Sequence, residues 1–192
     1  MISIVMPLHD RKEFLCEAIE SVLNQSTFCY ELIVVITKDT PIEIRNILEL
    51  YPSIRILESE TREIADKLNI GIEQANGTWI KYLASDDLLM PNTVYILDSL
   101  CRDETKYYYG YFYYINEFGI ITEAIKSDSL VTSCFSKELF NKIGKFNKDA
   151  KYEDKDFIDR IPQESKIQIP QFTGKYRVHQ GQSANTPRYA WR

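Results

Sequence analysis

The chain has 192 residues, a net charge of −5 and an apolar fraction of 44%, which are values of an ordinary globular protein with a substantial core. Lysines and arginines are mixed among the acids and form no basic stripe, which argues against nucleic-acid binding. An acidic protein that binds an anionic substrate needs a local cation, so this charge balance points towards a metal ion.

The N-terminal run MISIVM is too short for the apolar core of a signal peptide, and no stretch approaches the ~20 apolar residues of a membrane-spanning helix. The 4 cysteines are scattered without a CxxC pair, so neither a zinc site nor a disulfide framework is predicted. We therefore expect a cytoplasmic protein without a transmembrane segment. Peripheral association with a membrane and the oligomeric state stay open.

The first part of the chain alternates short apolar runs with helical patterns. Strands are expected at Ile2–Leu8, Glu31–Ile36, Ser53–Leu57 and Trp79–Ala84. Helices are expected at Glu13–Gln25, Pro41–Leu50 and Ile64–Ala75. Pro7 should end the first strand because proline has no N–H, and Asn76-Gly77 should stop the third helix. This alternation over the first ~85 residues predicts a doubly wound, Rossmann-like α/β fold with a mostly parallel central sheet flanked by helices.

The second part changes character after one further helix, which is expected from Pro91 to about Leu100. Tyr107–Ile115 is almost wholly aromatic, and Asn116–Gly119 supplies a turn into Ile120–Ala124, which predicts a small β-hairpin. Its aromatic side chains suit either a stacking platform for sugars or bases, or the packing of a strand against the core. No linker or repeat interrupts the chain, so a single domain over residues 1–192 is predicted.

Polar segments follow the predicted parallel strands at residues 7–11, 37–40 and 85–87. Ligands of open α/β sheets bind beyond the carboxyl ends of the strands. Asp86 and Asp87 should repel each other unless a cation or solvent neutralises them. Because Mg²⁺ and Mn²⁺ take one or two protein carboxylates and complete their shell with phosphate oxygens and water, the pair is a candidate diphosphate–metal clamp. Capping of the helix after Pro91 is the competing interpretation.

A series of motifs, in order and spread over nearly the whole chain, resembles family-2 glycosyltransferases of the GT-A fold. They are SIVMPLHDR, IADKLNIGIEQANGTWIKYLASDD, YINEFGIIT, FSKELFNKIGKFNKD, YEDKDFIDRI and YRVHQGQSAN. The first looks like that family's opening strand and nucleotide loop, and the second like the helix, glycine turn and strand that lead into its acidic motif. The resemblance implies a GT-A domain with a nucleotide-sugar-binding half at about 1–100 and an acceptor-binding half at about 101–192.

The resemblance also implies an activity: an inverting, hexosyltransferase-like enzyme that moves a sugar from a nucleotide-diphospho-sugar, most often a UDP-sugar, to a hydroxyl of a glycan or polysaccharide. Asp86 and Asp87 would hold Mn²⁺ or Mg²⁺ against the donor diphosphate, and His179 would be a further metal ligand or a phosphate contact. Asp154 would be the general base that takes the acceptor's proton, with its neighbour Glu153 as rival. Further donor-site residues would be Pro7, Leu8, His9, Arg11, Thr37, Asp66, Asn69, Ser85 and Asp86 itself.

The chain also departs from the family pattern. Thr37 stands where many members carry the aspartate that recognises uracil, and Ala84 replaces the first aspartate of the frequent Asp-x-Asp-Asp form, so the donor base is not fixed by the resemblance. Simpler interpretations are surface polarity for Asp66, Asn69 and His179, and helix capping for Asp154. The alternative functions are a catalytically silent nucleotide- or glycan-binding module and a sugar-nucleotide nucleotidyltransferase. The latter would need a glycine-rich basic loop, which residues 9–13 lack.

Overall fold

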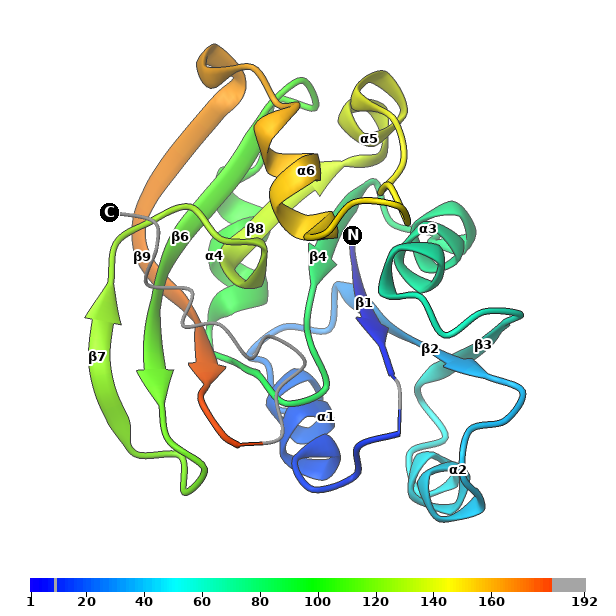
Figure 1. Ribbon diagram of the computed structural model, residues 1–192. Coiled ribbons are helices and arrows are strands. Elements are labelled where there is room, and N and C mark those ends of the chain that lie inside the picture. The colour runs from blue at the N-terminus through cyan, green and yellow to red at the C-terminus, as the bar shows by residue number, and fades with distance from the viewer. Residues whose placement is uncertain (9, 181–192) are drawn as a thin grey trace.

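The computed structural model describes residues 1–8 and 10–180, whose strands form one nine-stranded sheet in the order β3-β2-β1-β4-β8-β6-β9-β5, with β7 paired to β6 (Figure 1). The strands are β1 (Ile2–Pro7), β2 (Tyr30–Thr37), β3 (Arg55–Ser59), β4 (Trp79–Tyr82), β5 (Leu88–Leu89), β6 (Tyr107–Ile115), β7 (Ile121–Ile125), β8 (Ser133–Ser136) and β9 (Lys166–Arg177).

The first four strands are parallel, with β1 between β2 and β4 and with β3 outside β2. This confirms the predicted Rossmann-like parallel sheet. β1 ends at Pro7, as its missing N–H requires. The third strand begins at Arg55, later than predicted, and the fourth already ends at Tyr82.

The later strands add a mixed sheet: β8 is antiparallel to β4 and to β6, β9 is parallel to β6, and β5 is antiparallel to β9. The predicted hairpin is β6–β7, and its turn is closed by Asn116, whose side-chain oxygen accepts from the N–H groups of Phe118 and Ile120. The ladder between β6 and β9 is irregular near Pro170. Tyr109 pairs with Gln168 whereas Tyr111 pairs with Phe172, so β9 bulges where proline cannot donate.

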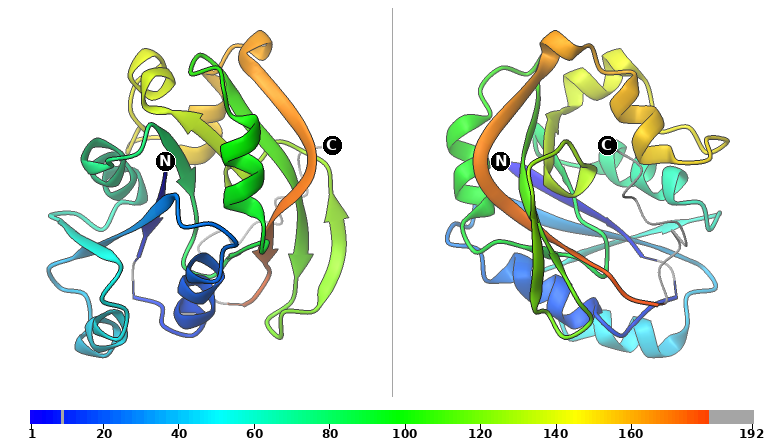
Figure 2. Two further views of the ribbon diagram at one scale, coloured as in Figure 1. Left: turned by 180° about the vertical axis from the view of Figure 1, so that it is seen from behind. Right: turned by 60° about the vertical axis from the view of Figure 1, so that its left-hand side comes forward.

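The helices cover both faces of the sheet. They are α1 (Leu15–Leu23), α2 (Ile42–Glu49), α3 (Ile64–Gln74), α4 (Thr93–Leu100), α5 (Lys137–Ile143) and α6 (Glu153–Asp159), with short 3-10 turns η1 (Leu130–Thr132) and η2 (Gln163–Ser165). Buried residues of α1, α2 and α4 share one hydrophobic cluster, and those of α3, α5 and α6 share a second one. Figure 2 shows α4 on the face opposite to α5 and α6. None of the described helices is long and apolar enough to cross a membrane.

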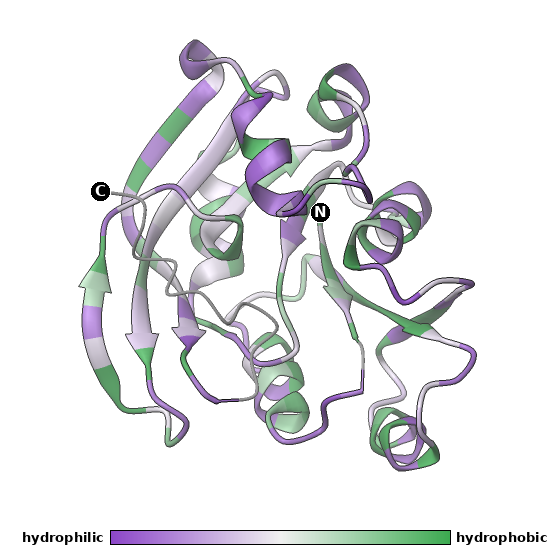
Figure 3. Ribbon diagram, in the orientation of Figure 1, coloured by the Kyte–Doolittle hydropathy of each residue, from purple (hydrophilic) through white to green (hydrophobic). Residues whose placement is uncertain are grey.

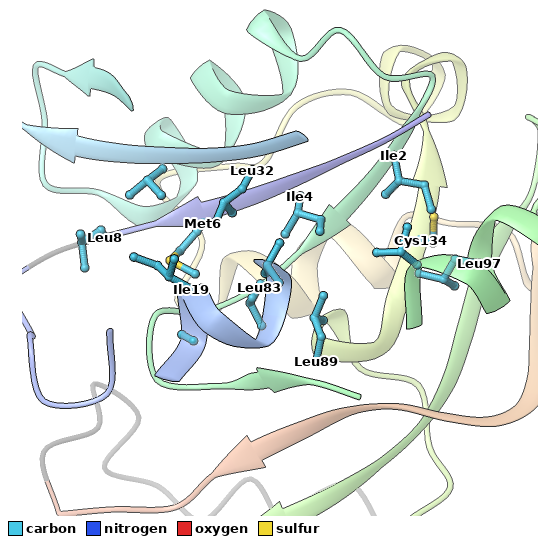
Figure 4. Close-up of a cluster of buried hydrophobic side chains, with 14 of the residues drawn as sticks. Ile2, Ile4, Met6, Leu8, Ile19, Leu32, Leu83, Leu89, Leu97 and Cys134 are labelled. Carbon is cyan, nitrogen blue, oxygen red and sulfur yellow. The ribbon is translucent and has the colours of Figure 1, made fainter. Parts of the chain in front are cut away.

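The central strands are apolar along their whole length because both of their faces are buried. Ile2, Ile4 and Met6 of β1 point into the cluster that α1, α2 and α4 share, together with Leu83 beyond β4 (Figure 4). Val5, between them, points to the opposite cluster under α3. Figure 3 shows the same contrast by hydropathy: β1 and β2 are largely hydrophobic, whereas α6 at the surface is largely hydrophilic.

Gly77 has a different role from the predicted helix stop. α3 ends at Gln74, and among the described residues positive φ angles occur only at Gly119 and Gly144. A Cβ atom on Gly77 would lie 2.6 Å from the Ser3 hydroxyl oxygen and 2.8 Å from the Met1 carbonyl oxygen. Glycine is therefore required here by the close approach to β1, which the sequence pattern alone did not distinguish from a helix end.

Candidate active site

Asp86 and His179 meet at the carboxyl edge of the parallel strands. Asp86 follows β4, and His179 follows the end of β9, 93 positions later in the sequence. The imidazole Nε2 lies 3.1 Å from the Asp86 Oδ2, and Nη1 of Arg11 lies 3.9 Å from the same oxygen. The His179 ring packs edge-on against Phe14, with 4.9 Å between the ring centroids. Three of the predicted donor-site residues are thus brought together.

Asp87 has different surroundings from its neighbour. It is 1% exposed, and its Oδ1 accepts a hydrogen bond of 2.9 Å from the main-chain N–H of Arg177. Among the residues that the structure describes, no group of three His, Cys, Asp or Glu side chains is placed to hold a metal ion. The predicted set of Asp86, Asp87 and His179 therefore does not form a three-ligand cluster, and coordination by Asp87 stays a prediction.

The Arg177 side chain is fully buried beneath this turn. Its guanidinium donates to the main-chain carbonyls of Asp86 and Glu117, each at 3.0 Å, and to the carboxylate of Glu17 at 2.7 Å. It also lies over the Phe14 ring, 4.2 Å from the centroid. Because a guanidinium has five donors in a fixed plane, one side chain ties together the β4 turn, the hairpin turn and the start of α1.

The chemistry of Asp86 and His179 fits a divalent cation. A carboxylate oxygen and an imidazole nitrogen in contact are ligands that Mn²⁺ accepts, and a donor diphosphate would supply further oxygens. The Asp86 side chain is 19% exposed and that of His179 8%, so the pair is sheltered and Asp86 is still open to solvent. Asp86 and His179 would thus hold Mn²⁺ or Mg²⁺, and a contribution from Asp87 stays a prediction.

The segment after β1 is anchored from below by Lys67 of α3. The buried Nζ of Lys67 donates a 2.7 Å hydrogen bond to the carbonyl of Leu8, and burial lowers the pKa of this lysine. Leu8 is itself buried and its N–H donates to the carbonyl of Val35 at 2.9 Å. Pro7 and Leu8 thus contribute a fixed main chain at this edge, while His9 lies outside the described residues.

The loop after β2 is held internally. Thr37 is buried, and both its N–H and its hydroxyl bond the Thr40 side-chain oxygen, at 3.0 and 3.2 Å. Arg45 donates to the carbonyls of Thr37 and Lys38. The exposed charges of this loop include the ion pair of Asp39 with Arg62, and the hydrogen bond from that guanidinium lowers the pKa of Asp39.

The remaining predicted donor residues have structural partners. Asp66 accepts a 2.6 Å hydrogen bond from the hydroxyl of Thr61. Asn69 bonds the main chain of Phe146 twice: its Nδ2 donates to the carbonyl at 3.0 Å, and its Oδ1 accepts from the N–H at 2.9 Å. Asn69 thereby ties α3 to the segment after α5, and a contact between Asn69 and a nucleotide stays a prediction. Ser85 is half-buried in the turn before Asp86.

A cavity of about 510 Å³ lies between the β6–β7 hairpin and α6, and Asp154 is among its lining residues. α6 begins at Glu153, so Asp154 belongs to its first turn. Its Oδ1 accepts from the N–H of Lys155 at 2.8 Å. Of the two rival carboxylates, Asp154 lines the cavity and Glu153 does not.

The aromatic side chains of β6 are divided between two roles. Tyr107 and Tyr108 are buried in the core clusters, as the packing interpretation predicts. Tyr109, Phe112 and Tyr114 line the cavity. The use of these rings as a stacking platform for a ligand stays a hypothesis.

Residues 3–160 match the family model of glycosyl transferase family 2. The chain belongs to this family. An uncharacterized glycosyltransferase of Rickettsia felis is 33% identical over 138 residues, which cover 68% of this chain and 23% of that protein. One from Haemophilus influenzae is 25% identical over 203 residues, covering 94% of this chain and 66% of that protein. The chain spans only about a fifth of the length of the rickettsial relatives that it matches at 29–33% identity.

Solved structures confirm the predicted GT-A fold. S. aureus TarS 1–349 in complex with UDP-GlcNAc has a TM-score of 0.77 at 15% identity, covering 94% of this chain and 59% of that chain. The mannosyltransferase PcManGT from Pyrobaculum calidifontis, in complex with GDP-Man and Mn²⁺, has a TM-score of 0.69 at 18% identity, covering 94% of this chain and 57% of that chain.

Sequence reasoning gave no role to Arg177 or Lys67. Arg177 lies within the YRVHQGQSAN motif, but its partners come from three distant segments. The spacing of Lys67 in the sequence does indicate burial. It follows Ile64 by three residues and precedes Gly71 by four, so it lies on the face of α3 that packs on the sheet. A lysine at such a position needs an internal acceptor, here the Leu8 carbonyl.

Proposed function

We propose that this chain transfers a sugar from a nucleotide-diphospho-sugar to a hydroxyl group of a glycan or polysaccharide, with inversion and with Mn²⁺ or Mg²⁺. The observation that carries the proposal is the contact of Asp86 with His179 at the carboxyl edge of the sheet, with Arg11 beside it. The family membership supports the reaction type. The complexes of two structural neighbours, with UDP-GlcNAc and with GDP-Man and Mn²⁺, support the donor class.

The donor diphosphate would lie against Arg11 and the metal held by Asp86 and His179. When bound, the ion supplies a Lewis acid that stabilises negative charge on the departing diphosphate. The nucleoside would lie along the edge formed by Leu8, Thr37 and Ser85. Internal hydrogen bonds hold the main chain at Leu8 and at Thr37. A UDP-sugar is our proposed donor. The loop that carries Thr37 in place of aspartate also carries the ion pairs of Asp39 with Arg62 and of Lys38 with Glu60.

The acceptor would bind in the cavity lined by Asp154. Its hydroxyl oxygen attacks the anomeric carbon, the bond from that carbon to the diphosphate oxygen breaks, and the configuration inverts in this single displacement. Asp154 takes the hydroxyl proton as the new glycosidic bond forms. Its place on the cavity wall favours Asp154 over Glu153 for this role.

A thermal-shift screen of UDP, GDP, dTDP, CDP and ADP, each with and without Mn²⁺, tests the donor site. A nucleotide at ~100 times its dissociation constant adds roughly 2.7 kcal/mol of stability, which raises the melting temperature visibly. We expect one nucleotide to stabilise the protein only with Mn²⁺, and Asp86→Asn to abolish that shift. Asp149→Asn, the same change at an exposed aspartate between α5 and α6, is the control.

Turnover separates the enzyme from the silent module. Incubation with the matching nucleotide sugar should release free sugar slowly, and only with Mn²⁺. Nucleotide binding without any release of free sugar would identify a binding module. If none of the nucleotides stabilises the protein in the presence of Mn²⁺, the proposed donor site is refuted.

A further inference from the structure

The described part of the wall of the cavity beside α6 carries a surplus of negative charge. The charged side chains among its described lining residues are four carboxylates and two ammonium groups: Glu123, Asp128, Asp154 and Asp159, with Lys155 and Lys166. Lys155 pairs with Asp159 at 2.6 Å, and Lys166 pairs with Asp128 at 3.1 Å. Each lysine thus already has a carboxylate partner within the cavity wall, and the formal balance of this lining is two negative charges.

Asp128 is held in a fixed position on the wall. Its Oδ1 accepts a 2.8 Å hydrogen bond from the Tyr107 hydroxyl, and its Oδ2 faces Lys166. Tyr107 is fully buried, and burial raises the pKa of its phenol, which therefore remains a donor. Lys166 is held by this contact with Asp128, so we expect it to stay on the cavity wall when a ligand binds.

The other part of the wall is aromatic. Tyr109, Phe112 and Tyr114 of β6 and Tyr176 of β9 line it. The Tyr114 ring packs edge-to-face on Phe112, with centroids 5.2 Å apart, and on Tyr176, with centroids 5.4 Å apart. These contacts fix the rings as a cluster that offers apolar surface together with phenol oxygens. A cavity of about 510 Å³ with such a lining has the size and composition of a small-molecule site.

We infer that the acceptor unit bound in this cavity is a saccharide without negative charge, a neutral sugar and not a uronic acid, a sialic acid or a phosphate-bearing sugar. The inference rests on the proposed function, because it takes this cavity as the acceptor site. The apolar C–H face of a sugar suits the ring cluster. Its hydroxyls donate charge-assisted hydrogen bonds to the carboxylates, whereas an anionic unit would meet like charges in a partly enclosed site where repulsion exceeds that in bulk water.

Paired saccharide probes test this inference directly. Each pair consists of two disaccharides whose terminal unit is either a neutral hexose (glucose, galactose or mannose) or the corresponding uronic acid, so that the two differ only at C6. Binding to the full chain is measured by calorimetry and saturation-transfer NMR, with UDP and Mn²⁺ present. We expect at least one neutral disaccharide to bind and its uronate counterpart to bind about tenfold more weakly at low salt, with the gap narrowing as salt is added.

A charge reversal sharpens the test. Glu123 is an exposed residue of β7 that lines the cavity, so Glu123→Lys should fold normally. We expect it to reduce the preference for the neutral sugar about tenfold. Glu49→Lys, at the exposed end of α2, is the matched control and should leave the preference unchanged.

The outcomes separate this inference from the proposed function. Three results would overturn the inference and leave the proposed donor site intact. The uronate could bind as tightly as the neutral sugar or more tightly, or Glu123→Lys could show an unchanged preference. The third result is that no neutral sugar binds while UDP and Mn²⁺ still stabilise the protein. Preferential binding of a neutral sugar in a protein that no nucleotide stabilises would refute the transferase, and with it the inference that the bound sugar is an acceptor.

Discussion

The main-chain N–H of Arg177 donates to the Asp87 carboxylate at 2.9 Å, 90 positions earlier in the sequence. The guanidinium of the same arginine donates to the main-chain carbonyl of Asp86 at 3.0 Å. One residue at the end of β9 thereby holds both members of the acidic pair. Asp87 is directed into the protein, and the Asp86 carboxylate is left facing His179. The preceding residue, Tyr176, lines the cavity beside α6, so β9 joins the proposed donor and acceptor sites.

Substitution of Arg177 should therefore affect both folding and the metal site. Arg177→Met removes a fully buried cation and leaves its acceptors without donors, so we expect the free energy of unfolding to fall by roughly 3–5 kcal/mol in urea titrations. Arg177→Lys keeps the charge but not the planar set of donors, and it should weaken UDP binding in Mn²⁺ about tenfold. Glu17→Gln, which weakens one half-exposed partner, should cost less than about 1 kcal/mol. Arg177→Lys with wild-type nucleotide affinity would show that the arginine stabilises the fold without positioning Asp86.

Asp154→Asn tests the proposed general base. Because an amide cannot take the acceptor's proton, we expect kcat to fall ~10²-fold or more while nucleotide binding is retained. Glu153→Gln, in the same turn of α6, is the matched control and should stay close to wild type. An active Asp154→Asn together with an inactive Glu153→Gln would assign the base to Glu153 instead. Donor hydrolysis and transfer to an acceptor should be measured side by side for both variants.

Lys81 of β4 gives the protein a pH-dependent stability. Its fully buried Nζ donates to the carbonyls of Tyr82 and Val131, at 2.9 and 2.5 Å, and burial lowers its pKa from 10.5 to about 7. Between these two values the unfolded chain holds a proton that the folded chain lacks. Stability should therefore rise with pH by up to about 1.4 kcal/mol per unit from about pH 7 towards pH 10, and the gain is absent below about pH 7.

Lys81→Met isolates this contribution from that of other titrating groups. Urea unfolding at pH 7, 8 and 9 should give a difference between wild type and variant that changes across the series, because the variant lacks the lysine's slope. Lys148→Met, at an exposed lysine, should follow the wild type at every pH. A constant difference between wild type and Lys81→Met would mean that Lys81 keeps the same charge in both states over this range.

The sequence predicted those parts of the fold that depend on local pattern. The continuous apolar runs of β1 and β2 and the helical spacing of apolar residues in α3 predicted the parallel half of the sheet. β8 was not predicted because its sequence, Ser-Cys-Phe-Ser, is buried on both faces but is not a continuous apolar run. β9 was not predicted because Pro170 interrupts its pattern. At the site, Asp86 and His179 belong to recognisable motifs. The inward turn of Asp87 was not predictable, since it depends on a contact with a strand 90 positions away.

Gly71 of α3 offers a test of how tightly the helix beside the proposed donor site is packed. A Cβ atom there would overlap Cγ1 of Val5 in β1 and lie 3.2 Å from Cγ2 of Val35. In an exposed helix Gly→Ala gains about 1 kcal/mol, but overpacking a buried contact costs about 1–3 kcal/mol. We expect Gly71→Ala to lower the free energy of unfolding by about 1 kcal/mol, measured by urea titration.

A double-mutant cycle identifies the cause. Val5→Ala removes the overlapping methyl groups, so Gly71→Ala should be neutral or favourable in that background, and the two changes should be non-additive by more than about 0.5 kcal/mol. Gly119→Ala is the control. It has open space around the missing Cβ but a φ of +78°, so its cost comes from the backbone and should be the same with and without Val5→Ala. Additive behaviour of Gly71→Ala with Val5→Ala would show that α3 moves to accommodate the methyl group, and that the Lys67–Leu8 anchor on the same helix is less rigid than its 2.7 Å hydrogen bond indicates.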